Sequence, residues 1–401
     1  MSEQIRAVAP ERHRALEDVR RRNLADILGI VHRSGRSTRA ELTRATGLNR
    51  STIAAIVGEL VRRRLVVEQA PEERGGVGRP SFVVVPDPAT IAIVVHPEVD
   101  AVVIAFVSLG GDVQRRFRFA QQRPPSPAEV VDLVAGIVEG VAAERESGAL
   151  RVLGVGAAVP GLVRSDRGFV ELAPALDWHG VEFARMLEAA TGLPAFAAND
   201  ANCGVLAEHR TAAGTGDFVY LNGGASGIGG GLVVGGRLLG GRSGFAGELG
   251  HVLVDPAGPR CRCGSTGCLQ AIVELGALRT AAGLDVDGAD ELLDALVAAI
   301  EQPGPAADVV DRQLVALGAA LRDAVNVVNP EVIVLGGFLG DLLEATGDRL
   351  IEIVRRTALP GAASDVSIVR AESGAGNLLV GAAELVFSGI LADPTTAPAA
   401  A

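Results

Sequence analysis

The sequence predicts an α/β body preceded by a small helical domain that ends in a β-hairpin. Beyond residue 90, strand-like apolar runs alternate with helical ones, and glycines stand at the strand ends. The first 80 residues instead show helical periodicity and capping signals. They hold 16 Arg against 10 Asp and Glu, a balance of +6, whereas the rest of the 401-residue chain carries −17, which together give −11. A basic head on an acidic body indicates that only the head meets a polyanion, although a basic surface without such a partner would have the same charge.

Three helices are expected in the head. Apolar residues recur at spacings of three and four over residues 21–35, which predicts the first helix. Thr38 and Glu41 form the T-x-x-E capping box of a second helix, Gly47 supplies the turn that ends it, and Asn49 caps a third helix. The residues expected to be buried are Leu24, Ile27, Leu28, Val31, Leu42, Leu48, Ile53, Ile56, Val57 and Leu60.

Two short helices joined through a glycine turn, followed by a glycine-rich hairpin, predict a winged helix-turn-helix. Its third helix would face the major groove with Arg50, Ser51 and Thr52. Arg79, in Gly78-Arg79-Pro80, resembles the short arms that enter a minor groove. A three-helix protein-interaction module shares the periodicity, but the capping box, turn, wing and charge together favour DNA binding.

The body contains an unusual group of sulfur residues. His251, Cys261, Cys263 and Cys268 have the spacing H-x9-C-x-C-x4-C in a chain with four cysteines in total. Four such ligands form a closed tetrahedral Zn²⁺ site with no position left for water, which makes the ion structural. Reactive or merely buried thiols are the alternative, but glycines at 264 and 267 shape the turn as a zinc site requires. Cys203, outside the pattern, is expected to be a small buried residue.

At these residues the sequence resembles a known family. GELGH followed by CRCGSTGCLQ resembles the signature of the ROK family (repressors, open reading frames and sugar kinases). AND at 198–200, VPG at 159–161, GGASGIGGG and NPEVIVLGG are similar to further motifs of that family, in the family's order. The resemblance implies an actin-like, sugar-kinase-like fold of two lobes around a cleft. The domains expected are a head over 1–85, a first lobe over 86–205 completed by a helix over 376–392, a second lobe with the zinc site over 206–375, and a disordered tail over 393–401.

The resemblance also implies a set of residues that contact sugar hydroxyls. Vicinal hydroxyls favour carboxylate acceptors and an amide that offers both a donor and an acceptor. His251 could ligate zinc through one ring nitrogen and reach the sugar with the other, so that the metal fixes its orientation. The family usually has Glu where this chain has Gln270, so one charged acceptor is lost. The expected sugar-binding set is Gly161, Asn199, Asp200, Glu248, His251 and Gln270.

Kinase activity is not expected. Asp200 is the general base in the family's kinases, but a sensor needs the same carboxylate to bind a hydroxyl. Sugar kinases of this fold cradle phosphate in a D-x-G-x-T turn, and the equivalent turn here is His96–Asp100, with Glu98 and Val99 at glycine positions. A carboxylate about 4 Å from a phosphate charge costs about 4 kcal/mol near a protein surface, enough to suppress nucleotide binding.

The sequence therefore favours a sugar-responsive transcriptional regulator, most simply a repressor. Its expected partners are operator DNA, a small sugar and a second copy of itself, in a homodimer or homotetramer. A sugar kinase with an added DNA-binding domain, and a repressor controlled by a partner protein, are the alternatives. No apolar leader or membrane span is evident, so a cytoplasmic location is expected.

Overall fold

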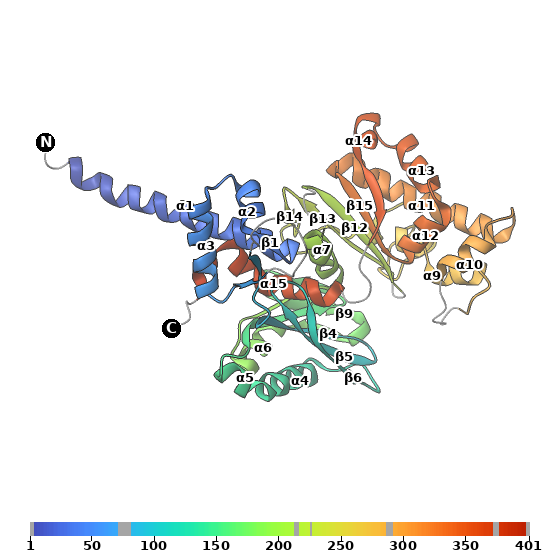
Figure 1. The fold of residues 1–401 in the computed structure, drawn as a ribbon. Coiled ribbons are helices and arrows are strands. Elements are labelled where there is room, and N and C mark those ends of the chain that lie inside the picture. Colours follow the sequence, from blue (N-terminus) through green and yellow to red (C-terminus); the bar gives the residue numbers. More distant parts are fainter. Residues whose placement is uncertain are drawn as a thin grey trace. The chain divides into compact units, whose positions relative to one another are not determined.

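The computed structural model describes residues 4–70, 82–211, 216–224, 227–285, 292–371 and 377–397. The chain forms two compact units, each with a five-stranded sheet (Figure 1). The first unit comprises Met1–Gly161, Arg167–Ala198 and Ala382–Ala401, and the second comprises Leu162–Asp166 and Asn199–Gly381. No helix among the described residues is long and apolar enough to cross a membrane.

Within residues 4–70 and 82–86, the head comprises α1 (Gln4–Ser34), β1 (Ser37–Thr38), α2 (Arg39–Thr46), α3 (Arg50–Arg62), β2 (Val66–Gln69) and β3 (Val83–Pro86). Its strands form a sheet in the order β1-β3-β2. Thr38 and Glu41 make both hydrogen bonds of the capping box, Gly47 ends α2 with φ 70°, and Asn49 caps α3. The predicted helix-turn-helix is confirmed.

Two details of the head differ from the prediction. The first helix begins at Gln4, well before the apolar pattern that starts at Arg21. Leu48 is half-buried rather than buried, because it lies in the exposed turn just before the α3 cap. The other apolar residues expected in the core of the head are buried.

The first unit also contains a five-stranded sheet, in the order β11 (Ala195–Asn199), β7 (Arg151–Val159), β4 (Thr90–Pro97), β5 (Ala101–Ser108) and β6 (Val113–Ala120). β4 pairs parallel with β7 and antiparallel with β5, and both β4 and β5 are buried along almost their whole length, which explains their continuous apolar sequence. Helices α4 (Pro127–Gly140) and α6 (Phe183–Thr191) lie on one face of this sheet, and the C-terminal part of α15 (Asn377–Ala392) lies on the other (Figure 1). The remaining elements of this unit are α5 (Ala142–Glu146), β9 (Phe169–Ala173), η1 (Pro174–Leu176) and β10 (Trp178–Val181).

The second unit contains a five-stranded sheet, in the order β14 (Arg237–Leu238), β13 (Gly227–Val234), β12 (Phe218–Gly224), β15 (Val332–Gly337) and β16 (Ser367–Arg370). β12 pairs parallel with β15 and antiparallel with β13, so a meander and a parallel crossover are combined as in the first unit. The other elements of this unit are β8 (Leu162–Arg164), α7 (Asp200–Thr211), η2 (Leu249–His251), α8 (Leu269–Ile272), α9 (Leu275–Ala281), α10 (Leu292–Ala299), α11 (Pro305–Val328), α12 (Phe338–Thr346), α13 (Arg349–Thr357) and α14 (Pro360–Asp365).

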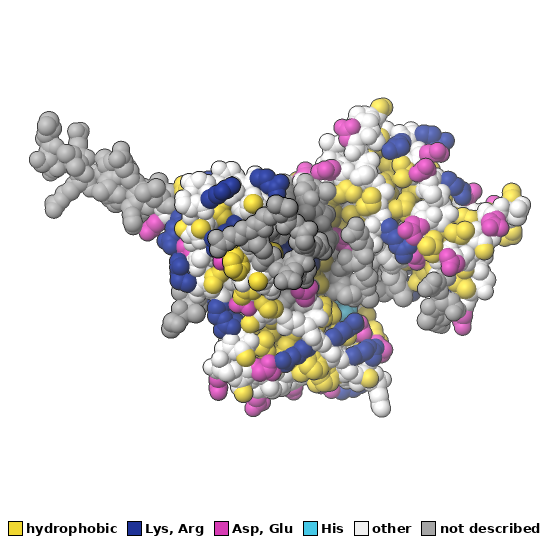
Figure 2. Space-filling model, viewed as in Figure 1, with side chains coloured by type: hydrophobic (Ala, Val, Ile, Leu, Met, Phe, Trp, Pro, Cys, Tyr) yellow, Lys and Arg dark blue, Asp and Glu magenta, His cyan; other side chains and the backbone are white. Residues whose placement is uncertain are grey.

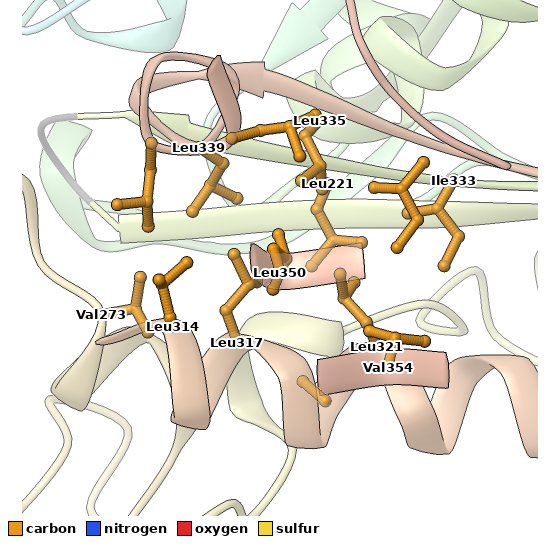
Figure 3. Close-up of a cluster of buried hydrophobic side chains, with 14 of the residues drawn as sticks. Leu221, Val273, Leu314, Leu317, Leu321, Ile333, Leu335, Leu339, Leu350 and Val354 are labelled. Carbon is orange, nitrogen blue, oxygen red and sulfur yellow. The ribbon is translucent and has the colours of Figure 1, made fainter. Parts of the chain in front are cut away.

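The core of the second unit follows the two-residue period of its strands. Leu221 and Ile333 face the cluster of leucines on α11, α12 and α13 (Figure 3). Their neighbours Tyr220 and Val334 point the other way and pack with Val205 of α7. Helix α7 covers this second face and therefore belongs to the second unit. The boundary between the two units lies at 198/199, seven residues before the predicted boundary at 205/206.

The C-terminal segment also differs from the prediction. The helix expected over 376–392 is α15 (Asn377–Ala392), but the chain then continues into η3 (Pro394–Thr396). Pro394 and Ala397 are buried, and Arg63 of the head donates to the Ala397 carbonyl at 2.6 Å. Ordered structure therefore extends to Ala397, where the sequence predicted a disordered tail from residue 393; residues 398–401 lie outside the described part.

A buried carboxylate joins two helices of the head. Glu59 on α3 is 6% exposed and accepts hydrogen bonds from Arg20 of α1, at 2.6 Å, and from Arg63, at 3.0 Å. Burial disfavours the charged form of Glu59, but the two guanidinium groups outweigh burial and lower the pKa of its carboxyl. A lowered folded-state pKa means that this stabilisation is present at neutral pH and is lost as the pH falls through that pKa.

Replacing Glu59 with Ala removes the shared acceptor of two guanidinium groups. We expect the amides of α1 and α3 to exchange faster with solvent, by an amount that corresponds to about 1–3 kcal/mol of local stability. Hydrogen exchange on the full chain measures this, and Asp18→Ala, which removes an exposed ion pair with Arg21, is the control. Unchanged exchange in the Glu59 variant would contradict the assignment.

Candidate functional site

The His and Cys residues singled out in the sequence assemble in the second unit. The ligand atoms of His251, Cys261, Cys263 and Cys268 all lie within 4.8 Å of one another. Cys261 Sγ lies 3.8 Å from His251 Nδ1, and Cys263 Sγ lies 3.7 Å from Cys268 Sγ. Three sulfurs and one imidazole nitrogen are the donor set that a soft, tetrahedral metal ion prefers. These residues could therefore bind a metal ion.

The loop that carries the cluster depends on a close backbone contact. Two antiparallel bridges, Leu253–Cys268 and Arg260–Thr266, fold the chain back on itself. Gly267 has φ 74°, and a Cβ there would lie 1.7 Å from the Asp255 carbonyl oxygen. Only glycine fits this position, and its backbone places Cys268 opposite the chain that leaves η2.

The thiols of the cluster differ in how easily they ionise. Burial opposes ionisation of Cys261, but hydrogen bonds from the Cys263 backbone and from Gln270 outweigh burial and lower the pKa of Cys261 to about 6. Burial, reinforced by the thiol of Cys263, raises the pKa of Cys268 to about 11. Neighbouring thiolates repel one another, so a bound cation would favour full ionisation of this group at neutral pH.

One carboxylate lies near the cluster, and a second lies within electrostatic reach of the first. Glu248 directly precedes η2, and Asp200 begins α7. Burial raises the pKa of Glu248, the charge of His251 lowers it, and the charge of Asp200 raises it again, so these three side chains lie within electrostatic reach of one another. Asn199 and Asp200 each accept a hydrogen bond from a backbone amide in the first turn of α7, at 3.2 and 2.8 Å. Most of the predicted sugar-binding set is thus brought together in one unit.

Gln270 makes two contacts that the sequence did not reveal. Its Nε2 donates to Cys261 Sγ at 3.4 Å, and its Oε1 accepts from the Ile228 amide of β13 at 3.3 Å. A glutamate could accept from Ile228 but could not donate to a sulfur. The amide therefore links the sulfur cluster to the sheet, while its contact with a sugar stays a prediction.

Gly161 belongs to the first unit. A Cβ at this position would lie 2.3 Å from the carbonyl oxygen of Leu172 on β9, so the glycine is needed for the packing of two backbone segments. Its contact with a ligand stays a prediction.

The predicted DNA-binding residues lie at the start of α3. Arg50 and Ser51 are exposed and Thr52 is half-buried, and Ser51 Oγ donates to the Asn49 cap at 2.6 Å. Figure 2 shows basic side chains over the helices of the head. β2 and β3 form the base of the predicted wing, but Arg79 lies outside the described residues.

Two further arginines of the head were not among the predicted DNA-binding residues. Arg36 and Arg44 are exposed before and at the end of α2, and both lower the pKa of Glu41 through their charge, after its hydrogen bonds to Thr38. The first helix of a helix-turn-helix crosses the DNA backbone, so arginines at its ends suit phosphate contacts. Their place at the ends of a capped helix was a signal that the sequence already contained.

The turn that the sequence analysis equated with a kinase phosphate cradle lies between β4 and β5. His96 Nδ1 lies 2.8 Å from the Ala158 carbonyl oxygen, so its ring is used within the unit. Arg118 of β6 lies 2.7 Å from Asp100 and 3.6 Å from Glu98, and its hydrogen bond lowers the pKa of Asp100. Arg118 reduces the combined charge of the two carboxylates from −2 to −1. That this turn disfavours phosphate stays a prediction.

Comparisons with known proteins identify both parts of the chain. The sequence model of the ROK family matches residues 99–388, and that of the MarR family matches residues 22–75. A solved ROK family transcriptional regulator, a homologue of the E. coli MLC protein, is 26% identical and covers 93% of this chain and 97% of its own, with a TM-score of 0.71. These matches confirm the predicted fold class, a sugar-kinase-like α/β body behind a winged helix domain.

Two curated relatives represent two activities. The xylose repressor of Bacillus subtilis (strain 168) is 28% identical over 253 residues, which are 62% of this chain and 65% of the repressor. The glucokinase of Thermotoga maritima is 39% identical over 150 residues, which are 37% of this chain and 47% of the kinase. The chain thus spans just under two thirds of the repressor and about half of the kinase.

Gly267→Ala tests the loop. The new Cβ would meet the Asp255 carbonyl oxygen, so we expect the variant to lose its metal-binding capacity and to melt at a lower temperature. Gly264→Ala is the matched control, since Gly264 has φ 94° but nothing within 4 Å of the Cβ position, and it should retain the metal at a cost of about 1–2 kcal/mol. Metal content by mass spectrometry and thermal denaturation measure both, and equal metal loss in the two variants would refute the contact.

Proposed function

The chain belongs to the ROK family, and from this premise we propose that it is a sugar-responsive transcriptional repressor. One observation carries the proposal: a winged helix head, matched by the MarR family over residues 22–75, is joined to a body that holds a Cys₃His cluster beside the mutually coupled side chains of His251, Glu248 and Asp200. A DNA-reading element and a polyol-binding element in one chain suit a regulator whose DNA affinity depends on a sugar.

The head is proposed to bind operator DNA through the first turn of α3. Arg50 offers an exposed guanidinium to guanine edges or phosphates, and the hydroxyls of Ser51 and Thr52 can donate or accept. Arg79 would enter the adjacent minor groove. Two copies, in a homodimer or a homotetramer, would place their heads on half-sites about 10 base pairs, or a multiple of 10, apart.

The metal is proposed to be a structural Zn²⁺ held by His251, Cys261, Cys263 and Cys268. The donor set supports zinc, because three thiolates and one imidazole complete its tetrahedral coordination without water. Zinc at such a site stabilises the fold of the loop and does not activate a substrate. Ligation through one ring nitrogen fixes the tautomer of His251 and directs its other nitrogen.

The effector is proposed to be a small sugar. Asn199, Asp200 and Glu248 can accept and donate to vicinal hydroxyls, and His251 adds a ring nitrogen fixed by the metal. Gly161 and Gln270 are proposed to complete the site. The likeness to a xylose repressor makes xylose the first sugar to test, and the likeness to a glucokinase makes glucose the second.

The sugar is proposed to favour an arrangement of the two units with lower operator affinity. A ligand shifts such an equilibrium only by its difference in affinity for the two states. A difference of about 1–3 kcal/mol changes operator affinity about 5- to 150-fold.

A sugar kinase with an added DNA-binding domain is the second candidate. The likeness to a glucokinase and the presence of Asp200 favour it. The turn at 98–100 opposes it, because two carboxylates and Arg118 leave a net negative charge where a kinase cradles phosphate. A coupled ATPase assay with a panel of hexoses and pentoses decides: we expect no turnover above background, and robust turnover would establish the kinase.

Arg50→Ala tests the DNA-binding surface. Loss of a guanidinium that contacts a base edge should weaken operator binding by about 1–3 kcal/mol, or about 5- to 150-fold, at fixed salt concentration. Arg356→Ala, an exposed arginine of α13 in the second unit, serves as control and should bind operator normally. A mobility-shift assay compares the three proteins, and wild-type affinity in the Arg50 variant would exclude α3 as the reading helix.

Asp200→Asn tests the sugar site. The variant keeps a side chain that can cap α7 but loses the charged acceptor, so we expect sugar affinity to fall by at least about 10-fold. Operator affinity without sugar should be unchanged, and Asp348→Asn, at the start of α13, should behave as wild type. Calorimetry with sugar and mobility shifts without it separate the two effects. Undiminished sugar binding would remove Asp200 from the site.

A further inference from the structure

Helix α15 belongs to both units: Asn377–Gly381 lies in the second and Ala382–Ala392 in the first. We propose that α15 transmits sugar occupancy to the DNA-binding head, and that Glu384 on this helix and His32 of the head are the positioning residues that make the connection. This inference rests on the proposed function, because it names the route by which that regulation acts.

The route begins at the sugar site. Asp200 is the first residue of α7, and Cys203 follows within the same turn. A Cβ on Gly381 of α15 would lie 1.7 Å from the Cys203 carbonyl oxygen. The backbones of α7 and α15 are therefore in direct contact, with no side chain between them to absorb a displacement. A shift of the first turn of α7 must move the start of α15.

The next contact lies in the first unit. A Cβ on Gly156 of β7 would lie 2.1 Å from the Ala382 carbonyl oxygen, and one on Gly154 would lie 3.1 Å from Val386. Here too α15 rests directly on backbone. An α-helix with an intact hydrogen-bond ladder moves as a rigid element, so displacement at Gly381 reaches the residues that follow.

The helix then meets the head at His32 of α1. His32 is 2% exposed, and its Nε2 lies 3.0 Å from a carboxylate oxygen of Glu384. Its Nδ1 contacts the carbonyl oxygen of Leu109, and its ring meets Phe387 edge-on at a centroid distance of 6.1 Å. Both ring nitrogens face oxygen acceptors, and two residues one turn apart on α15 hold the ring. α1 is thereby fixed to α15 from inside the protein.

Further bonds fix the head to the segment after α15. Arg63, just past the end of α3, donates to the carbonyl oxygens of Thr395 and Ala397, at 3.1 and 2.6 Å. Arg21 of α1 lies 3.6 Å from Asp393. Both the first helix and the end of the DNA-reading helix are thus attached to α15 and its continuation, so movement of α15 changes the direction in which α3 is presented.

A second group of contacts, which does not involve α15, joins the head to the part of the first unit that contains the five-stranded sheet, called the lobe below. Thr90 Oγ1 donates to the Arg64 carbonyl oxygen at 2.7 Å, and Arg64 donates to the Gly148 carbonyl oxygen at 2.6 Å. These bonds provide a matched control, because they are also buried or half-buried links between head and lobe but involve no residue of α15.

The experiment measures operator affinity with and without the sugar that the wild-type chain binds most tightly in a calorimetric panel beginning with xylose and glucose. The full chain is used in four forms: wild type, Glu384→Ala, Glu384→Gln and Thr90→Val. The wild-type ratio of the two affinities is expected to lie between about 5 and 150. In Glu384→Ala it should fall to within about twofold of one, while the sugar affinity measured by calorimetry stays within about threefold of wild type.

Glu384→Gln keeps an acceptor for His32 Nε2–H and should retain most of the wild-type ratio, and Thr90→Val should retain all of it. A merely structural role for Glu384 would lower sugar affinity and stability together and would leave the ratio intact. If Glu384→Ala does not fold, His32→Gln is measured in its place, with the same expected loss of the ratio.

The outcomes separate the two proposals. If no sugar changes the operator affinity of the wild-type chain, both the proposed function and this inference are overturned. If sugar changes the operator affinity of the wild-type chain and of a folded Glu384→Ala variant by the same factor, the inference alone is overturned. Loss of the response in Thr90→Val as well as in Glu384→Ala also overturns it, because any link between head and lobe would then suffice.

Discussion

The gathering of four potential metal ligands, whose donor atoms lie within 4.8 Å of one another, is the constraint on which the proposed site depends. The segment between η2 and α8 has two backbone bridges, turns at Gly264 and Gly267, and a Leu253 that is 55% exposed, so it buries little apolar surface of its own. Such a segment needs another source of free energy to offset the entropy lost on ordering. Zinc, as proposed, supplies it. The proposed ligation would also orient His251, whose charge and that of Asp200 both act on Glu248, and Gln270 connects Cys261 to β13.

Direct backbone contacts hold three pairs of segments in fixed positions. Gly267 against Asp255, Gly381 against Cys203 and Gly156 against Ala382 leave no room for even a methyl group. Side chains at such contacts could change rotamer and absorb a small displacement, whereas backbone cannot. A sensor needs this stiffness, because a coupling of about 1–3 kcal/mol is lost if the intervening elements yield. The head itself is stiffened differently, by the buried carboxylate of Glu59 between two arginines.

The sequence predicted best what depends on neighbouring residues. The caps at Thr38 and Asn49 and the turn at Gly47 follow from local chemistry, and the Cys₃His group follows from spacing within 18 residues. Features that depend on distant partners were missed: Ala397 is ordered because Arg63 binds its carbonyl oxygen, and Arg118 meets Asp100 because of the register between β5 and β6. Gln270 is an example of both. The sequence shows a glutamine where the family usually has glutamate, but its hydrogen bond to the sulfur of Cys261 could not be inferred without the fold.

The central claim is that a metal-held His251 shapes the sugar site. The most direct measurement is the sugar affinity of the full chain, by calorimetry, as purified, after removal of the metal with a chelator, and after return of one equivalent of Zn²⁺. The account predicts a loss of at least about 10-fold on removal of the metal and recovery on its return. Equal sugar affinity with and without the metal would contradict it.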